Sequence, residues 1–334
     1  RKTGCFWLQA CLSLTLLTGC SAESTKNYKQ AAQDLENGNY EVALEEYEAA
    51  ISAGVKPAQS YRGAGVAQLK LGNYDETVTY FSNALDCDKV GKALKKDILS
   101  YRAAAYLKLK EYEEAMADCQ ALAESYNMDA DLYFLTGETA LAMDSYEEAS
   151  SNFEQAYGED ATYDRALQIY GAYLDKDMEA DGTRYLEAAL SGNAKNAQDH
   201  CDRGRVYYYM DDYENATAEL KQAIDGDNTE ALALLGMVYM DQGDSANART
   251  MFQQYVSQAE NGAKGFNGLA LCDIEDGDYD SALSNISSGI HVADAEDMQS
   301  LLFNEIAVYE KSWTSRLRCR KRTNIWDCIR MIRQ

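Results

Sequence analysis

Apolar residues recur along most of the chain at intervals of three and four, which is the spacing of an α-helix. Residues 38–51 read GNYEVALEEYEAAI, and residues 72–85 read GNYDETVTYFSNAL. Long alternating runs of Val, Ile and Thr between turn residues, which are typical of strands, do not appear in the sequence. The pattern therefore predicts an all-α protein built from short helices.

The same phrase returns along the chain at a nearly constant spacing. The residue that follows each turn marks the register and is a tyrosine in most copies. Successive markers lie 34, 38, 34, 32, 35, 32 and 34 residues apart. The marker positions are Tyr40, Tyr74, Tyr112, Tyr146, Met178, Tyr213, Ser245 and Tyr279. A fixed period of this length indicates an array of stacked supersecondary units.

The period and the recurring residues resemble the tetratricopeptide repeat family over roughly residues 26–310. This resemblance implies a right-handed superhelical solenoid of antiparallel helix pairs, with a helix A and a helix B in each of about eight to nine units. A coiled coil is the main alternative, but the regular turns interrupt any sustained heptad. Another helical repeat, of the Sel1 type, is usually longer per unit.

Within each copy, a small residue falls near the middle of helix A, where it would let helix B cross closely. A large residue on helix B is expected to fill the core. These large residues are Tyr47, Phe81, Cys119, Phe153, Leu220, Phe252 and Ile286. The copy around Tyr163–Leu190 lacks the turn glycine and has Asp181 at its alanine position, so we expect a bent or irregular element there.

Two residue types mark the turn between helix A and helix B. Gly38, Gly72, Gly243 and Gly277 stand where helix A should end, in a left-handed cap conformation. The residues that follow them are candidate N-caps of helix B, and they are Asn39, Asn73, Asp244 and Asp278.

Residues 1–19 have the composition of an export signal, with a basic start and an apolar stretch from Cys5 to Leu17. Such a stretch spans about 20 Å as a helix, which is short of the roughly 30 Å hydrocarbon core of a bilayer. Its end, Leu17, Thr18, Gly19 and Cys20, resembles the lipobox of bacterial lipoproteins. That resemblance implies cleavage before Cys20 and a diacylglycerol on its sulfur, with residues 20–25 as a lipidated N-terminus and short tether. The alternative is a buried apolar helix that happens to end in cysteine.

The formal net charge of −24 is unevenly distributed. The last 24 residues carry +7, and residues 20–310 carry about −33. An acidic body of this kind repels nucleic acid and anionic lipid headgroups, which are usually recognised by basic patches. We therefore expect no nucleic-acid binding by the body of the chain.

Residues 311–334 form an atypical basic tail without the repeat pattern. One interpretation is a segment that binds a membrane or nucleic acid. We favour the hypothesis that it is a frameshift product. A back-translation read two bases further on permits KLDFETAVQKADEYLGLYPDDKA, which has the aromatic, alanine, core tyrosine and closing proline of a helix B. Sequencing the gene tests this hypothesis, and a single intact frame would contradict it.

Residues that could carry out chemistry are scarce and isolated. The two histidines, His200 and His291, stand beside no nucleophile or metal-ligand motif. The cysteines of the array show no C-x-x-C spacing, and they are Cys87, Cys119, Cys201 and Cys272. The sequence therefore indicates no enzyme, no metal site and no cofactor.

The resemblance to tetratricopeptide proteins implies a concave groove, lined by the A helices, that binds extended protein or peptide segments. The candidate groove residues are Tyr28, Arg62, Tyr170, Tyr173, Arg205, Tyr208 and Tyr209. Cochaperones of the family bind a C-terminal carboxylate with Lys and Asn on the first helix A. The matching positions here are Tyr28 and Ala32, so that specificity is absent.

These features together predict a bacterial lipoprotein that is held in the cell envelope outside the cytoplasm by its acyl anchor. Its expected function is that of a scaffold that binds a protein or peptide ligand, with no small-molecule substrate. The alternative is a cytosolic tetratricopeptide adaptor whose N-terminus only resembles a signal. A third class, an enzyme with a helical-repeat lid, would require a catalytic constellation that the sequence does not show.

Overall fold

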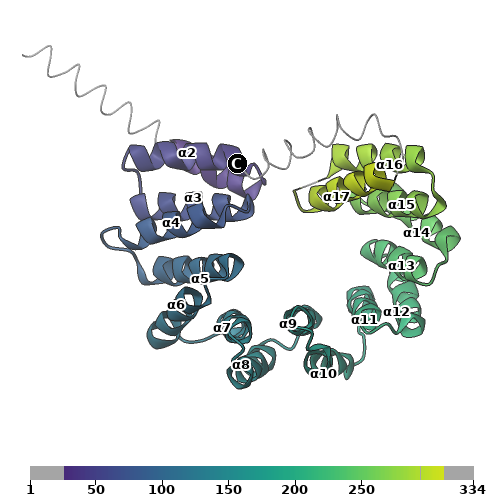
Figure 1. Cartoon of the computed structure of the whole chain (residues 1–334), viewed down its shortest axis with the longest axis horizontal. Helices are drawn as coiled ribbons and strands as arrows, with labels where there is room; N and C mark the ends of the chain where they lie inside the picture. The colour runs from purple at the N-terminus through teal and green to yellow at the C-terminus, as the bar shows by residue number, and fades with distance from the viewer. Residues whose placement is uncertain (1–25, 294, 312–334) are drawn as a thin grey trace, which may run out of the picture. The chain divides into compact units, whose positions relative to one another are not determined.

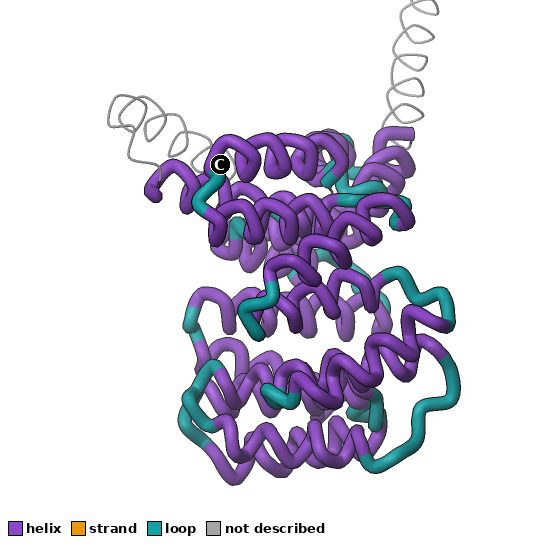
Figure 2. The backbone as a smooth tube through the Cα atoms, turned by 90° about the vertical axis from the view of Figure 1, so that its right-hand side faces the viewer, coloured by secondary structure: helices purple, strands orange, loops and turns teal. Residues whose placement is uncertain are grey.

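A computed structural model of the chain describes residues 26–293 and 295–311. This part consists of helices joined by turns and contains no strand (Figure 2). The predicted lipobox, Leu17–Cys20, and residues 312–334 of the basic tail lie outside the described residues. Within residues 26–293 and 295–311, no helix has both the length and the apolar character needed to cross a bilayer.

The described residues divide after Glu159 into two compact units. Unit 1 opens with a helix at residues 26–36, and its remaining helices follow in chain order (Figure 1). They are α2 (Tyr40–Ser52), α3 (Pro57–Lys70), α4 (Tyr74–Leu85), α5 (Lys92–Leu109), α6 (Tyr112–Ser125), α7 (Ala130–Ala142) and α8 (Tyr146–Glu159). The even-numbered helices are the B helices of four successive pairs.

Unit 2 has the same organisation and begins at Asp160. Its helices are α9 (Tyr163–Leu174), α10 (Glu179–Leu190), α11 (Ala197–Tyr209), α12 (Tyr213–Asp225), α13 (Glu230–Asp241), α14 (Ser245–Gln258), α15 (Ala263–Asp276), α16 (Tyr279–Val292) and α17 (Ala295–Lys311). In unit 2, α9, α11, α13 and α15 each pack on the helix B that follows and on the next helix A. The prediction of an all-α solenoid of antiparallel helix pairs is confirmed for the described residues.

Helix A and helix B approach each other most closely at the predicted small residues. A Cβ added at Gly65 would lie 2.7 Å from the Phe81 ring, and one at Gly137 would lie 2.7 Å from the Phe153 ring. Such distances are shorter than real Cβ contacts, so the glycine is what allows the two helices to cross there. The large residue of each helix B fills the space thus created.

The predicted large core residues are buried in every copy in which they were expected. Phe81, Phe153 and Leu220 have no exposed surface, and Tyr47 retains only 4% of its surface exposed. Cys119, Phe252 and Ile286 are also buried. Periodicity alone was sufficient to identify this layer because each copy repeats the same contact between two helices.

The turn between helix A and helix B has a left-handed residue in all eight copies. Four are the predicted glycines, with φ near +74° to +80° at Gly38, Gly72, Gly243 and Gly277. The other four copies place a side chain there, at Lys110, Asp144, Asp177 and Asp211, with φ between 56° and 63°. Aspartate tolerates this conformation better than most residues, which explains three of the four substitutions.

The predicted N-caps divide into two groups. Asp244 and Asp278 accept a hydrogen bond from a backbone N–H in the first turn of helix B, as expected. Asn39 and Asn73 make no such bond. Their side-chain amides donate instead to residues of the preceding helix A, and Asn39 Nδ2 lies 2.9 Å from Asp34 Oδ1.

The prediction of an irregular element around Tyr163–Leu190 is wrong. The segment forms an ordinary pair, α9 with α10, joined by a turn in which Asp177 takes the left-handed position. The close contact has shifted by one residue from Asp181 to Gly182, where an added Cβ would lie 3.0 Å from the Tyr170 backbone. A glycine next to the expected position thus preserves the helix crossing.

Two glycine substitutions within unit 2 test the role of close contact. Gly236 faces the Phe252 ring, and an added Cβ would lie 2.5 Å from it. We expect Gly236→Ala to lower the free energy of unfolding by about 1–3 kcal/mol, because the ring has to move. Chemical denaturation followed by circular dichroism measures the change.

Gly171, in the interior of α9, is the matched control, because an added Cβ there meets no atom within 4 Å. Gly171→Ala is expected to raise the free energy of unfolding by about 0.5–1 kcal/mol, because alanine favours a helix interior over glycine. Equal effects of the two substitutions would contradict the role assigned to the close contact.

Candidate functional site

The A helices of unit 1 form an open groove of about 450 Å³ between α5 and α7. Its α5 wall is lined by residues at three- and four-residue spacing, and hence by one face of the helix. The lining consists of Ala93, Lys96, Asp97, Ser100, Tyr101 and Ala104 from α5, with Asp129, Asp131, Leu132 and Leu135 from the start of α7. A volume of this size falls within the range of about 300–1,000 Å³ that ligand pockets occupy.

Ion pairs between successive A helices fix the charged side chains of this groove. The Lys96 ammonium lies 2.5 Å from Asp129 Oδ2, across from α5 to the N-cap of α7. Arg62 of α3 donates from Nε to Asp97 Oδ2 at 2.6 Å and stands 5.3 Å from the centre of the Tyr101 ring. These contacts hold the charged side chains of the groove wall in place.

The Asp129 carboxylate is held in its ionised form. Partial burial by itself would raise its pKa, but hydrogen bonds from Lys96 and from the backbone N–H of Leu132 outweigh that effect. The pKa of Asp129 is therefore below its ordinary value of 3.8. Asp129 thus stays negatively charged on the groove wall at neutral pH.

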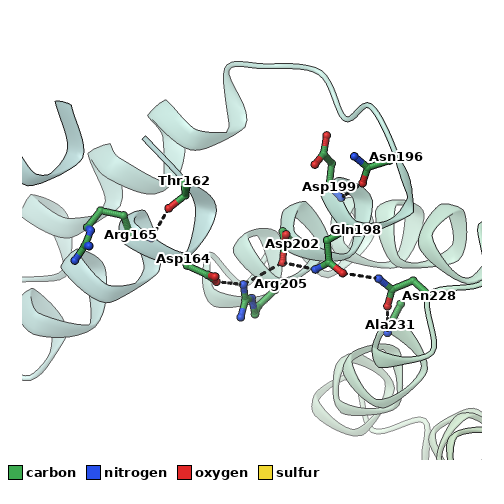
Figure 3. A network of polar contacts seen from close by, with 10 residues as sticks. All are labelled: Thr162, Asp164, Arg165, Asn196, Gln198, Asp199, Asp202, Arg205, Asn228 and Ala231. Carbon is green, nitrogen blue, oxygen red and sulfur yellow. Dashed lines mark hydrogen bonds and ion pairs between the residues drawn. The ribbon is translucent and has the colours of Figure 1, made fainter. Parts of the chain in front are cut away.

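Unit 2 carries a polar network along its A helices (Figure 3). Arg205 of α11 binds Asp164 of α9 and, at 3.0 Å, Asp202 of its own helix. Gln198 extends the network from Asp202 to Asn228 through bonds of 3.1 and 3.0 Å. The network reaches α13, where the backbone N–H of Ala231 donates to Asn228. It therefore links α9, α11 and α13.

Burial raises the pKa of the Asp202 carboxyl within this network, although Gln198 and Arg205 both favour its ionised form. Arg205 offsets the charge of two carboxylates at once. The ion pair of Arg205 with Asp164 joins neighbouring repeats. About a third of the Arg205 side chain remains exposed.

Of the seven predicted groove residues, the structure brings three into contact with one another. Tyr170, Tyr208 and Tyr209 come together in unit 2, where the Tyr209 ring lies 6.3 Å from that of Tyr170 and 5.7 Å from that of Tyr208. Arg62 borders the α5–α7 groove, and Arg205 belongs to the network of Figure 3.

Tyr28 and Tyr173 make different contacts. Tyr28 is half-buried, packs edge-on against Tyr47 and has the Lys56 ammonium 4.6 Å above its ring. Tyr173 is 2% exposed and stacks on Tyr185, so it has almost no surface to offer a ligand. The position of Tyr173 along helix A predicted that its side chain would line the groove, but in this copy that side of the helix faces the core.

Sequence reasoning missed the groove residues Lys96, Asp97 and Asp129. A signal for them was present in the sequence, because opposite charges lie about one repeat apart, at Lys96 and Asp129 and at Arg62 and Asp97. Charges at this separation occupy similar positions on neighbouring A helices and can therefore pair. Lys96, Asp97 and Asp129 are neither aromatic nor arginine, the residue types that predicted the other groove positions.

The described residues contain no cluster of His, Cys, Asp and Glu that could hold a metal ion. His200 Nδ1 lies 2.6 Å from Glu219 Oε2, and Arg203 binds the other oxygen of that carboxylate. Burial raises the pKa of the Cys201 and Cys272 thiols to about 11. Thiols with such values are poor nucleophiles at neutral pH.

The pairing of Lys96 with Asp129 makes a testable prediction about the groove. In the Lys96→Met variant, we expect the pKa of Asp129 to rise toward its ordinary value, because the hydrogen bond and the positive charge are removed. A pH titration of the Asp129 carboxyl carbon by NMR measures this. In the wild type, ionised Asp129 stabilises the folded chain above pH 3.8, and this contribution is lost as the pH falls through the lowered pKa of Asp129. Lys96→Met should make this contribution smaller. An unchanged midpoint of the Asp129 titration in Lys96→Met would contradict the assigned pairing of Lys96 with Asp129.

Comparison with known proteins agrees with this architecture. The family model described as tetratricopeptide repeat matches residues 28–91, 201–265 and 234–286. RNA polymerase II-associated protein 3 from Xenopus laevis is 26% identical over 203 residues, which cover 55% of this chain and 30% of that protein. The chain thus spans about a third of the length of the curated relatives it matches.

Similar solved structures include a tetratricopeptide repeat protein from Parabacteroides merdae. It is 17% identical, with a TM-score of 0.47, and the match covers 75% of this chain and 98% of that one. MamA from Desulfovibrio magneticus is 19% identical, with a TM-score of 0.42, over 50% of this chain and 93% of that one. The family match and the repeated helix pairs together identify the fold of the described residues as an all-α solenoid of tetratricopeptide repeats.

Proposed function

We propose that this protein is a scaffold that binds an extended protein or peptide segment on the A-helix side of its repeats. The observation that carries this proposal is the α5–α7 groove, which is open and walled by ordered charges. The groove also offers apolar contacts from Ala104, Leu135 and the Tyr101 ring. A segment lying along it would find both apolar contacts and polar partners, as in most peptide-binding sites.

We further propose that the chain works in the bacterial cell envelope, outside the cytoplasm, and is attached to a membrane through lipid on Cys20. The support for this part is the sequence of residues 1–20, with its basic start, short apolar stretch and Leu17–Cys20 motif. Two or more acyl chains, at about 0.8 kcal/mol per buried CH₂, would hold the protein stably on a bilayer. A cytosolic adaptor with the same groove is the alternative.

Fatty-acid labelling distinguishes these two locations. Cells fed an alkyne fatty acid should label the wild-type protein, and Cys20→Ala should lose the label because the acceptor sulfur is gone. Cys87→Ala is the matched control and should keep it. Absence of label in the wild type, or its retention in Cys20→Ala, would favour the cytosolic adaptor.

Site-specific photo-crosslinking in cells tests the binding surface itself. A photoreactive amino acid at Ser100 or Asp131, both in the groove, should crosslink to the same partner protein. The same amino acid at Thr79 of α4 or Gln120 of α6, both exposed on B helices, should not. Crosslinks from the B-helix positions alone would overturn the proposal that the groove is the binding site.

A further inference from the structure

Four tyrosines form one cluster at the turn side of unit 2, and we call them the tyrosine cluster. Tyr209, at the end of α11, packs edge-on against Tyr170 of α9 and against Tyr208, its neighbour in the chain. Tyr208 in turn lies 6.3 Å from Tyr213 of α12, measured between ring centres. The cluster therefore joins three helices by their aromatic rings.

Carboxylates surround this cluster. The Tyr208 hydroxyl donates to Asp241 Oδ2 at 2.6 Å, and the Tyr213 hydroxyl donates to Asp211 Oδ1 at 2.9 Å. The Tyr170 hydroxyl lies 3.3 Å from Glu179 Oε1. The three acidic residues come from three places in the fold, namely the start of α10, the α11–α12 turn and the end of α13.

Negative charge acts on the cluster as a whole. Burial is the main reason why the pKa of Tyr208 and Tyr170 is raised, and the carboxylates at Asp241 and Glu179 raise it further. The field of Asp211 reaches both Tyr170 and Tyr213. The hydroxyls of Tyr170, Tyr208 and Tyr213, whose pKa values are all raised, therefore remain protonated at neutral pH and add no negative charge of their own.

The cluster has one ring available to a partner. Tyr209 is 47% exposed, which places it among the few large exposed apolar side chains of the described residues. Tyr170 is buried beneath it, and Tyr208 and Tyr213 are half-buried. The nearest arginine along α11, Arg205, already binds Asp164 and Asp202.

We propose that the tyrosine cluster binds a lysine or arginine side chain of a partner protein segment. A cation above the exposed face of Tyr209 is attracted by the ring, at about 0.5–1 kcal/mol for an exposed site. The neighbouring carboxylates add charge-assisted hydrogen bonds, and Asp211 and Asp241 each have lone pairs beyond the one that a tyrosine hydroxyl uses. An acidic segment would be repelled by the same groups.

This inference rests on the proposed scaffold function and names the chemistry of the partner at one point of the surface. The ligand is a basic residue within a polypeptide. The packed tyrosine rings and the three carboxylates provide orientation as well as charge, since the tyrosine hydroxyls contact the carboxylates.

NMR titration of the full chain with a defined probe tests the proposal. The probe is the acetylated, amidated peptide Gly-Lys-Gly-Arg-Gly, and the control peptide has Glu at both charged positions. With tyrosine rings labelled with carbon-13, the Tyr209 and Tyr208 signals should shift with the basic peptide and not with the acidic one. Absence of any shift with the basic peptide would overturn the proposal.

Two substitutions test which side chains of the tyrosine cluster bind the basic peptide. Tyr209→Ala should weaken binding of the basic peptide about two- to fivefold, which corresponds to the loss of one exposed cation–ring contact. Asp241→Asn should also weaken it and should reduce its dependence on salt. Because Tyr209 is half-exposed at the end of a helix, the fold should be retained, and circular dichroism checks this.

Tyr146→Ala is the matched control. Tyr146 is 48% exposed, follows its turn at the position equivalent to Tyr213, and bonds to Asp144 as Tyr213 bonds to Asp211. Equal weakening by Tyr146→Ala would show that any exposed tyrosine contributes and would contradict a specific site. Failure of the titration, with crosslinking at Ser100 intact, would refute the tyrosine cluster and leave the scaffold function standing.

Discussion

The close crossing of helix A and helix B at a small residue is the steric contact that sets the spacing of the repeats. Phe252 makes this contact twice, because its ring faces Gly236 of the helix A in its own repeat and Gly268 of the helix A in the next repeat. One large side chain thus fixes the distance within a pair and the distance between pairs. The spacing of successive A helices follows from it, and that spacing allows Lys96 to reach Asp129.

The charged residues are distributed differently in the two units. In unit 1, helices α2, α4, α6 and α8 carry aspartate and glutamate but no lysine or arginine. The A helices α3 and α5 of that unit hold basic residues, some of which are paired with carboxylates, as Arg62 is with Asp97. The acidity of unit 1 therefore lies mainly on its B helices, and the groove wall carries both signs. Unit 2 instead gathers carboxylates around exposed Tyr209.

The sequence was sufficient to predict the helix pairs, their register and the buried residue of each helix B, because the period repeats one contact many times. The prediction from sequence failed where a residue at another position, or of another type, makes the same helix crossing or the same left-handed turn. Gly182 replaced the expected contact at position 181, and Asp177 took a left-handed turn position without glycine. The groove was harder to predict, since Lys96 and Asp129 become a pair only when two A helices lie side by side. Tyr173, on the expected phase, turned into the core instead.

The proposed function requires that partners bind on the A-helix side of the repeats. Hydrogen exchange of the purified chain, with and without the partner recovered by crosslinking, tests it most directly. We expect the bound partner to slow exchange in α5 and α7 of unit 1 and at the end of α11 in unit 2, and to leave exchange in α4 and α6 unchanged. Slower exchange confined to the B helices would contradict it.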